Sequence, residues 1–329
     1  MKCPLCLTQR TAVLEVLEFE RIKHLYRSQL GVEVVTTNDH LTLRKCQRCD
    51  LRFYDPCPAG DASFYTQLAK HKWYYLSEKN EFEIAARYLS ECRSLLEIGA
   101  GTGAFAAKLP QIRYLGLELN GNAAAEARSE GVNVQAETIE MHVSRKETAY
   151  DAVCSFQVLE HIPDTHGFLS AAVSSIKPGG LMIHSVPSED SFMGRRANVI
   201  LNMPPHHATR WTDTALRNIA KMFNLEVVDI VHEPLSDQHI SSYCTQGVQS
   251  FVNTILGRRD RTLDATYSNL AVRAVTRSIA LPWEWTLRAS INRPPGHSVV
   301  AVYRKTANAG VEMTKQQTSI YCCESLSAN

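Results

Sequence analysis

The chain has 329 residues, of which 44% are hydrophobic and 21% charged, a composition typical of an ordinary globular protein of about two domains. Its formal net charge of +1 argues against nucleic acid as a partner, because proteins that neutralise phosphates usually carry a basic excess. No apolar run approaches the roughly 18 residues of a membrane span and none follows Lys2, so we expect no membrane span, no secretory signal and a cytoplasmic protein.

Cysteines near the N-terminus form two pairs with equal spacing. The pairs are Cys3 with Cys6 and Cys46 with Cys49. Two intervening residues let both thiolates of a pair bind one tetrahedral ion, and two such pairs make a closed four-sulfur site that suits structural zinc. We therefore predict a zinc-ribbon-like module over residues 1–60, with short strands at 32–36 and 40–43. Cysteines without metal, or with a redox role, are the alternative, and Cys57 is expected to lie outside the site.

The next segment, residues 61–92, has a helical pattern and is expected to link the module to the main domain and to cover its ligand. Its aromatic residues Tyr65, Tyr74 and Tyr75 could equally pack in a core. Across 93–305, strands and helices alternate, which predicts a largely parallel sheet covered by helices on both faces.

The expected strands of this main domain are 94–98, 113–117, 132–135, 152–156, 181–186, 225–231 and 298–303. The expected helices are one from the glycine-rich turn to Leu109, then 123–130, 167–176, which ends at the sequence KPGG, and 212–222, opened by Thr212. A helical insertion is expected at about 233–295, and a disordered tail over 306–329. Ligands of such sheets bind at the carboxyl ends of the strands.

A glycine-rich turn, LLEIGAGTG, follows the first of these strands and ends at Gly103. Glycines let the backbone turn tightly and approach a ligand closely. The second strand ends at Glu118, whose carboxylate can accept hydrogen bonds from both hydroxyls of a ribose. Both features fit a nicotinamide dinucleotide as well as S-adenosylmethionine, and a bare turn without a ligand is a further alternative.

Two later segments separate these cofactors: YDAVCSFQVLEHIPD at 150–164 and KPGG one helix later. Together with LLEIGAGTG and GLELN, in this order, they resemble class I S-adenosylmethionine-dependent methyltransferases over about 95–231 and the last strand. The resemblance implies a Rossmann-like seven-stranded α/β sheet. The cysteine pairs followed by LRFYDPCP also resemble a subgroup of bacterial methyltransferases with N-terminal zinc modules, some of which methylate sugars.

The resemblance further implies a set of cofactor-binding residues along the carboxyl edge of the sheet. They are Glu97, Gly99, Ala100, Gly101 and Gly103 around the methionine part and the ribose, Glu118 and Leu119 at the ribose hydroxyls, Glu137 beside the adenine, and Phe156 and Gln157 beneath the sulfonium. Families of this kind often carry aspartate where this chain has Glu137.

Candidates for the chemistry are histidines on the expected ligand side. His206 and His207 follow the fifth strand in NMPPHHATRW, and either could be a general base near neutral pH or simply pack at a helix entrance. His206 is the first choice, on the family resemblance. His161, next to Glu160 just beyond the cofactor floor, takes part in the chemistry, orients the site or is structural.

These observations favour a methyltransferase for a small-molecule acceptor, such as a sugar or another cell-envelope or secondary-metabolite precursor. A methyltransferase for RNA or protein, with the zinc module as recognition element, is the second hypothesis. A non-catalytic cofactor-binding docking protein is the third, and a nicotinamide oxidoreductase comes last. The insertion would be a substrate lid or the face of a homodimer. The methylated atom, carbon, oxygen or nitrogen, stays open.

Overall fold

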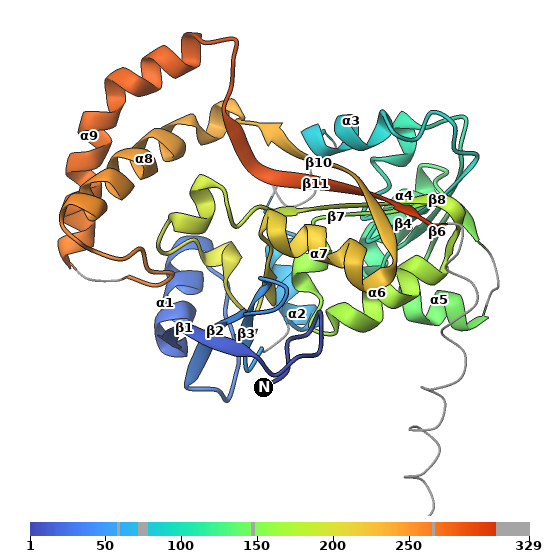
Figure 1. Ribbon diagram of the computed structural model, residues 1–329, viewed down its shortest axis with the longest axis horizontal. Coiled ribbons are helices and arrows are strands. Elements are labelled where there is room, and N and C mark those ends of the chain that lie inside the picture. The colour runs from blue at the N-terminus through green and yellow to red at the C-terminus, as the bar shows by residue number, and fades with distance from the viewer. Residues whose placement is uncertain (58–59, 72–77, 146–148, 265–266, 307–329) are drawn as a thin grey trace, which may run out of the picture.

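Seven strands form the main sheet of the chain, as the computed structural model shows (Figure 1). The structure describes all residues except 58–59, 72–77, 146–148, 265–266 and 307–329, so the tail expected at 306–329 lies outside it beyond Thr306. In spatial order the strands are β10 (Leu225–Pro234), β11 (Pro295–Lys305), β8 (Ile176–Pro187), β7 (Tyr150–Phe156), β4 (Ser94–Ile98), β5 (Arg113–Leu117) and β6 (Val134–Gln135). The predicted seven-stranded Rossmann-like sheet is confirmed.

The order of the strands creates a switch point between β4 and β7. From β4 the chain first builds outward through β5 and β6, and then returns to place β7 on the other side of β4. The adjacent pairs from β6 to β8 are parallel, whereas β11 runs antiparallel to both of its neighbours. Ligands of open α/β sheets bind outside the carboxyl ends of the strands at such a point.

Helices cover both faces of this sheet because the side chains of each strand alternate between the faces. Leu96, Val153 and Met182 belong to the core on one face, whereas Leu95, Cys154 and Ile183 belong to the core on the other. The first face is covered by α5 (Ile139–Arg145), α6 (Thr165–Ser174) and α7 (Asp213–Phe223), the second by α3 (Asn80–Ala86), and α4 (Gly121–Ser129) packs near β6.

Helix α7 begins where the sequence predicts, because the Thr212 hydroxyl accepts a hydrogen bond from the backbone N–H of Ala215 at 3.0 Å. The predicted helix after the glycine-rich turn is wrong, since only a 3₁₀ turn, η1 (Ala106–Lys108), forms there. Gly103 has a left-handed φ of 80°, and Pro110 excludes its predecessor from the helical region. Too few residues remain between these two for an α-helix.

Two smaller expectations also fail. Residues 32–36 form no strand, although Val32 and Val34 are buried. Their alternating burial fits an extended segment that packs against the N-terminal core without a hydrogen-bonded ladder. KPGG does not end a helix directly, because α6 ends at Ser174 and KPGG already belongs to the first part of β8.

A second, antiparallel sheet contains the N-terminal strands and one strand from the middle of the chain. Its order is β1 (Thr11–Glu18), β2 (His40–Cys46), β3 (Arg52–Asp55) and β9 (Thr209–Arg210), and α1 (Phe19–Leu30) follows β1. Phe53 lies opposite Thr209 in the ladder, and Tyr54 donates its N–H to the carbonyl of Ala208 at 3.1 Å. The N-terminal module is therefore joined by backbone hydrogen bonds to the segment that carries His206 and His207.

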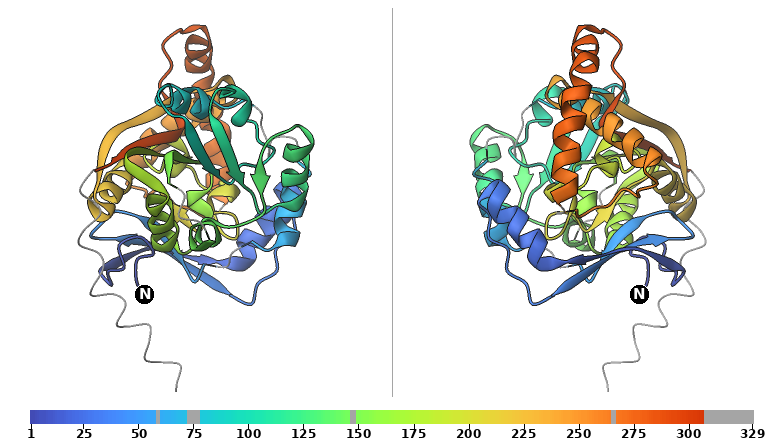
Figure 2. Two further views of the ribbon diagram at one scale, coloured as in Figure 1. Left: turned by 90° about the vertical axis from the view of Figure 1, so that its right-hand side faces the viewer. Right: turned by 90° about the vertical axis from the view of Figure 1, so that its left-hand side faces the viewer.

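Two helices, α8 (Ile240–Ile255) and α9 (Tyr267–Ala289), connect β10 to β11 and stand out from the sheet (Figure 2). The two helices pack on each other around Trp283, whose ring centroid lies 5.5 Å from that of Tyr243. Gly247 packs against the same ring, and a Cβ at this position would come within 2.7 Å of a Trp283 side-chain atom. Among the described residues, no helix is both long and apolar enough to cross a membrane.

Asp151 ties the start of β7 to the start of β4, and its loss should weaken the fold at neutral pH. One of its oxygens accepts hydrogen bonds from the N–H groups of Arg93 and Ser94, and the other lies 2.6 Å from the Lys177 ammonium. These contacts, led by Lys177, lower the pKa of Asp151 to about 2. A lowered pKa contributes stability above the ordinary value and loses it as pH falls.

We expect Asp151→Asn to reduce the free energy of unfolding by about 1 kcal/mol at pH 7, a modest value because the carboxylate is partly solvated. The difference from the natural chain should shrink between pH 4 and pH 2. Urea unfolding at several pH values measures this, and a difference that stays constant down to pH 2 would contradict it.

Candidate functional site

A large pocket of about 1460 Å³ opens at the carboxyl edge of the sheet, beside the switch point. One half is lined by the residues that follow β4, β5, β6 and β7. The other half is lined by residues 60–66, by the segment 199–207 and by the start of β11. The volume exceeds the 300–1,000 Å³ of usual small-molecule sites, so there is room for two ligands side by side.

The glycine-rich turn forms the inner wall of the first half. Gly99 and Gly101 line the pocket with left-handed φ angles of 75° and 55°, and Ala100 lines it between them. A Cβ on Gly99 would come within 2.4 Å of Val158. Gly103 does not line the pocket. Glycine is needed there for the turn itself, because the residue has a φ of 80° and a Cβ would lie 2.9 Å from the Val132 side chain.

Glu118 and Leu119 form the rim at the end of β5. One carboxylate oxygen of Glu118 accepts the N–H of Gly101 at 2.8 Å, and the other accepts the N–H of Asn120 at 2.6 Å. Ionised carboxylates have about four acceptor positions, so each oxygen can accept one further hydrogen bond. Leu119 is 68% exposed at the pocket edge, where an apolar side chain gains by covering a flat ligand.

Two further acids line this half but already have partners. Glu97 is buried and accepts the hydroxyl of Tyr114 at 2.6 Å, and burial raises its pKa to about 8. Glu137 is buried with one oxygen 2.7 Å from Nδ1 of His142 and the other paired with Arg145. Glu137 lies on the pocket wall, with its carboxylate turned to two side chains of α5, and its contact with an adenine stays a prediction.

The floor is formed by Phe156 and Gln157 at the end of β7. Phe156 packs edge-to-face against Phe82 and Phe105, with ring centroids 4.9 and 4.7 Å away. Gln157 has a φ of 57° and lies near the hydroxyls of Ser185 and Ser298. A left-handed residue other than glycine is strained, and such strain gathers at functional sites.

The second half of the pocket brings together His161, His206 and His207. The His161 and His206 rings lie 4.5 Å apart between centroids, and the His206 and His207 rings stack at 4.7 Å. Burial lowers the pKa of all three, that of His161 to about 4, so the imidazoles are neutral at pH 7. Tyr65 packs against His161 and His206, whereas Tyr74 and Tyr75 lie outside the described residues.

Glu160 lies among these histidines with its carboxylate 3.8 Å from Nε2 of His161 and 3.9 Å from Nε2 of His207. It is 1% exposed, and burial raises its pKa to about 8. Neither of its oxygens accepts a hydrogen bond from the part of the chain that the structure describes. A buried acid in this state is costly to hold and points to a ligand.

The N-terminal module holds the histidine segment in place. The hydroxyl of Tyr26 donates to the carbonyls of Ile200 and Met203 at 3.0 and 2.9 Å, and that of Tyr54 donates to Asn202 at 2.8 Å. Both tyrosines are buried. The module thus fixes the backbone just before His206 and His207.

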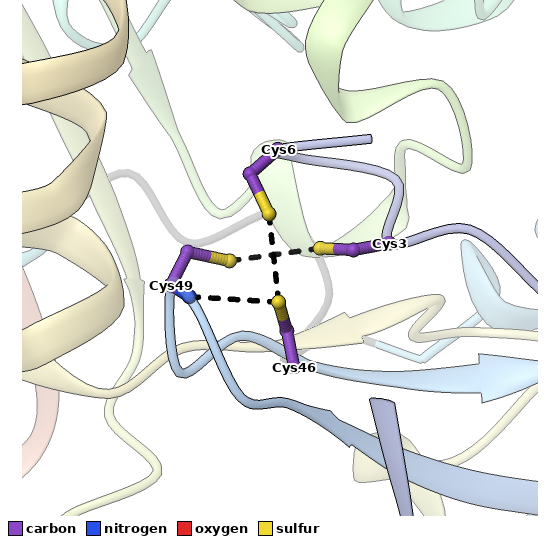
Figure 3. Close-up of side chains that lie close together, drawn as sticks. All are labelled: Cys3, Cys6, Cys46 and Cys49. Atoms are coloured by element: carbon purple, nitrogen blue, oxygen red, sulfur yellow. Dashed lines mark hydrogen bonds between the residues drawn. The ribbon is translucent and has the colours of Figure 1, made fainter. Parts of the chain in front are cut away.

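The four cysteines of the two predicted pairs meet in one cluster (Figure 3). Sγ of Cys3 lies 3.6 Å from Sγ of Cys49, and Sγ of Cys6 lies 3.4 Å from Sγ of Cys46. Four sulfurs about 2.3 Å from one zinc ion would be about 3.8 Å apart, so the observed cluster fits such an ion. Cys57 is not part of it.

A family model described as a methyltransferase domain matches residues 45–230, which is more than half of the chain. The chain belongs to this methyltransferase family. The match contains the glycine-rich turn, Glu118, the β7 floor and the three histidines. It confirms the family that the sequence motifs indicate.

Relatives of this chain include the ubiquinone biosynthesis O-methyltransferase of Cronobacter sakazakii, 28% identical over 160 residues. The match covers 45% of this chain and 63% of that protein. The enzyme of the same name from Dinoroseobacter shibae is 27% identical over 185 residues. That match covers 47% of this chain and 73% of the Dinoroseobacter protein. Among solved structures, an S-adenosylmethionine-dependent methyltransferase from Archaeoglobus fulgidus has a TM-score of 0.49 and 17% identity, covering 73% of this chain and all of that one.

Glu81, Glu233 and His297 also line the pocket, and their place there does not follow from the sequence motifs. Glu81 lines the pocket from α3, and Glu233 lies 2.8 Å from Nδ1 of His297. His297 stands at the beginning of β11, and because β11 is antiparallel its beginning reaches the carboxyl edge of the other strands. For His297 the missing signal was the direction of the last strand, which the sequence pattern does not show.

Glu118 gives the sharpest test of the cofactor half. We expect Glu118→Ala to weaken S-adenosylmethionine binding by about 1–3 kcal/mol, because charge-assisted hydrogen bonds to the ribose are lost together with the support of the Gly101 N–H. Isothermal titration calorimetry measures the change. Glu126→Ala, on the exposed face of α4, is the matched control, and equal affinities for the two variants would refute the assignment.

Proposed function

We propose that this protein transfers the methyl group of S-adenosylmethionine to a small-molecule acceptor. The observation that carries the proposal is the single pocket that joins the glycine-rich turn to the buried histidines and Glu160. Membership of the methyltransferase family supports the reaction type. S-adenosylmethionine, when bound, supplies a methyl group on a sulfonium that is already a good leaving group.

The cofactor half fits this molecule in three respects. The turn at Gly99 to Gly101 lets the backbone approach a ligand, the free acceptor positions of Glu118 suit ribose hydroxyls, and the exposed Leu119 offers an apolar surface to a base. Phe156 and Gln157 close the floor toward the acceptor half. Positioning the acceptor in line with the methyl group then does much of the catalytic work.

The acceptor half is lined by both polar and aromatic side chains, which favours a small molecule. His161, His206 and His207 offer polar contacts there, and Tyr65 adds an aromatic wall. His239, at the start of the insertion, also lines the pocket, which supports contact between that part and the acceptor. The exposed apolar side chains of α9, among them Ile279 and Trp285, are a candidate homodimer face.

Among the relatives, the ubiquinone biosynthesis O-methyltransferases favour an oxygen acceptor on a small organic molecule. We therefore propose an oxygen atom of a small organic molecule as the acceptor for this chain, with a sugar or another envelope precursor as the alternative.

We further propose that the four-cysteine cluster binds one structural zinc ion. The cluster is buried against the core that also contains residues of α6 and α7, and it does not line the pocket. A closed four-sulfur site leaves no open coordination position. Its role is therefore to hold the module that positions the histidine segment.

An experiment with methyl-labelled S-adenosylmethionine tests the proposed function. The purified protein is incubated with host extract, which is then separated into small-molecule, RNA and protein fractions. We expect label in the small-molecule fraction. Label confined to RNA or protein would replace the acceptor class and recast the zinc module as a recognition element.

A further inference from the structure

Three of the histidines that line the pocket, His161, His206 and His207, bring ring nitrogens close together. His161 belongs to the short turn η2 (Leu159–His161) after β7, whereas His206 and His207 come from the segment before β9. Despite this separation in the chain, one ligand nitrogen from each lies within 4.8 Å of the others. Apart from the four cysteines, no other group of this kind occurs among the described residues.

Backbone carbonyls fix the orientation of two of these rings. Nδ1 of His161 lies 2.5 Å from the carbonyl oxygen of His206, and Nδ1 of His206 lies 3.1 Å from that of Leu201. A carbonyl only accepts, so each Nδ1 must carry the proton and each Nε2 keeps its lone pair. Histidines that bind metal ions in proteins are held in this way, with the other ring nitrogen donating to a carbonyl or carboxylate.

Glu160 supplies a second and independent sign of a cation. Its carboxylate is buried, faces the same pocket and accepts no hydrogen bond from the described residues. It lies within 4 Å of Nε2 of both His161 and His207. A positive ion among these groups would give the carboxylate the partner that the protein chain does not provide.

We propose that His161, His206 and His207 bind one divalent transition-metal ion, with the Glu160 carboxylate beside it as a charge partner that is not itself a ligand. Imidazole nitrogens suit zinc and its neighbours, and three protein ligands with an open position are the arrangement of catalytic rather than structural sites. The three histidines line the acceptor half, so an ion held there would be placed to bind a hydroxyl or carbonyl oxygen of the acceptor. This role rests on the proposed function, whereas binding of the ion does not.

The test is a metal count on the full chain, with zinc or cobalt(II) alone as the probe. After saturation and removal of excess ion, we expect two ions per natural chain and one in each of His161→Gln and His207→Gln. Cobalt(II) should show the intense sulfur-to-metal absorption of the cysteine site together with weaker bands from a nitrogen-bound ion, and only the weaker bands should disappear in the histidine variants. His239→Gln, which changes a histidine of the same pocket outside the cluster, should keep both ions.

One ion per natural chain that shows only the sulfur-to-metal absorption, or two ions in both histidine variants, would overturn the metal site. The count and the spectrum of the natural chain need no variant, so they decide the matter even if a variant fails to fold. Two ions in a protein that transfers no label would remove the proposed function and leave the metal site standing. Label transfer by a chain that holds only the cysteine-bound ion would remove the metal site and leave the proposed function standing.

Discussion

Cys46→Ser should remove the proposed structural zinc ion and destabilise the N-terminal module by several kcal/mol. Zinc binding to small four-ligand modules contributes on the order of 10 kcal/mol, and in such modules this energy is folding energy. Cys46 is fully buried, ends β2, and its Sγ accepts the N–H groups of Arg48 and Cys49 at 3.4 and 3.5 Å. A hydroxyl at this position binds zinc poorly and leaves three thiolates without their ion.

The effect should reach the histidine segment, since Tyr54 and β3 hold its backbone. We therefore expect Cys46→Ser to lose zinc in metal analysis, to melt at a lower temperature and to lose methyl transfer. Cys57→Ser is the matched control, because Cys57 lies outside the cluster. A reduced natural chain that contains no zinc, or a Cys46→Ser chain as stable as Cys57→Ser, would contradict the account.

Gly101→Arg should lower the rate of methyl transfer by more than 100-fold while the protein stays folded. Gly101 lines the pocket with a φ of 55°, a conformation that costs a residue with a side chain about 1–2 kcal/mol. That cost is small beside the stability of a domain of this size, but the long side chain would occupy the space in front of the turn and disturb the hydrogen bond from Gly101 to Glu118.

Ala125→Arg is the control for the added charge, because Ala125 is exposed on α4. Labelled transfer and circular dichroism are measured on both variants. We expect activity to be lost only in Gly101→Arg, with similar melting curves for the two. Transfer at the natural rate by Gly101→Arg would show that the cofactor does not bind at the turn.

Local sequence signals predicted much of the fold. The cap at Thr212, the glycine-rich turn and the strands that alternate with helices all depend on neighbours in the chain, and the structure has them. The same holds for the cysteine pairs, since a two-residue gap already places both thiols of a pair side by side. The helix expected after the turn failed because Gly103 and Pro110 restrict the same short segment from both ends.

What the sequence could not show depends on contacts between distant segments. The strand β9 has two residues and exists only because it pairs with β3. The contact between His161 and His206 depends on the sheet order, and the arrival of His297 at the same edge depends on the reversed direction of β11. Patterns of local hydrophobicity carry no information on such pairings.

The most direct test of the central claim is calorimetric titration of the natural protein with S-adenosylmethionine, its demethylated product and, separately, NADH. We expect saturable binding of S-adenosylmethionine and of its demethylated product at one site per chain, with no heat from NADH. Binding of NADH without S-adenosylmethionine would contradict the account and turn the same glycine-rich turn into a nicotinamide site.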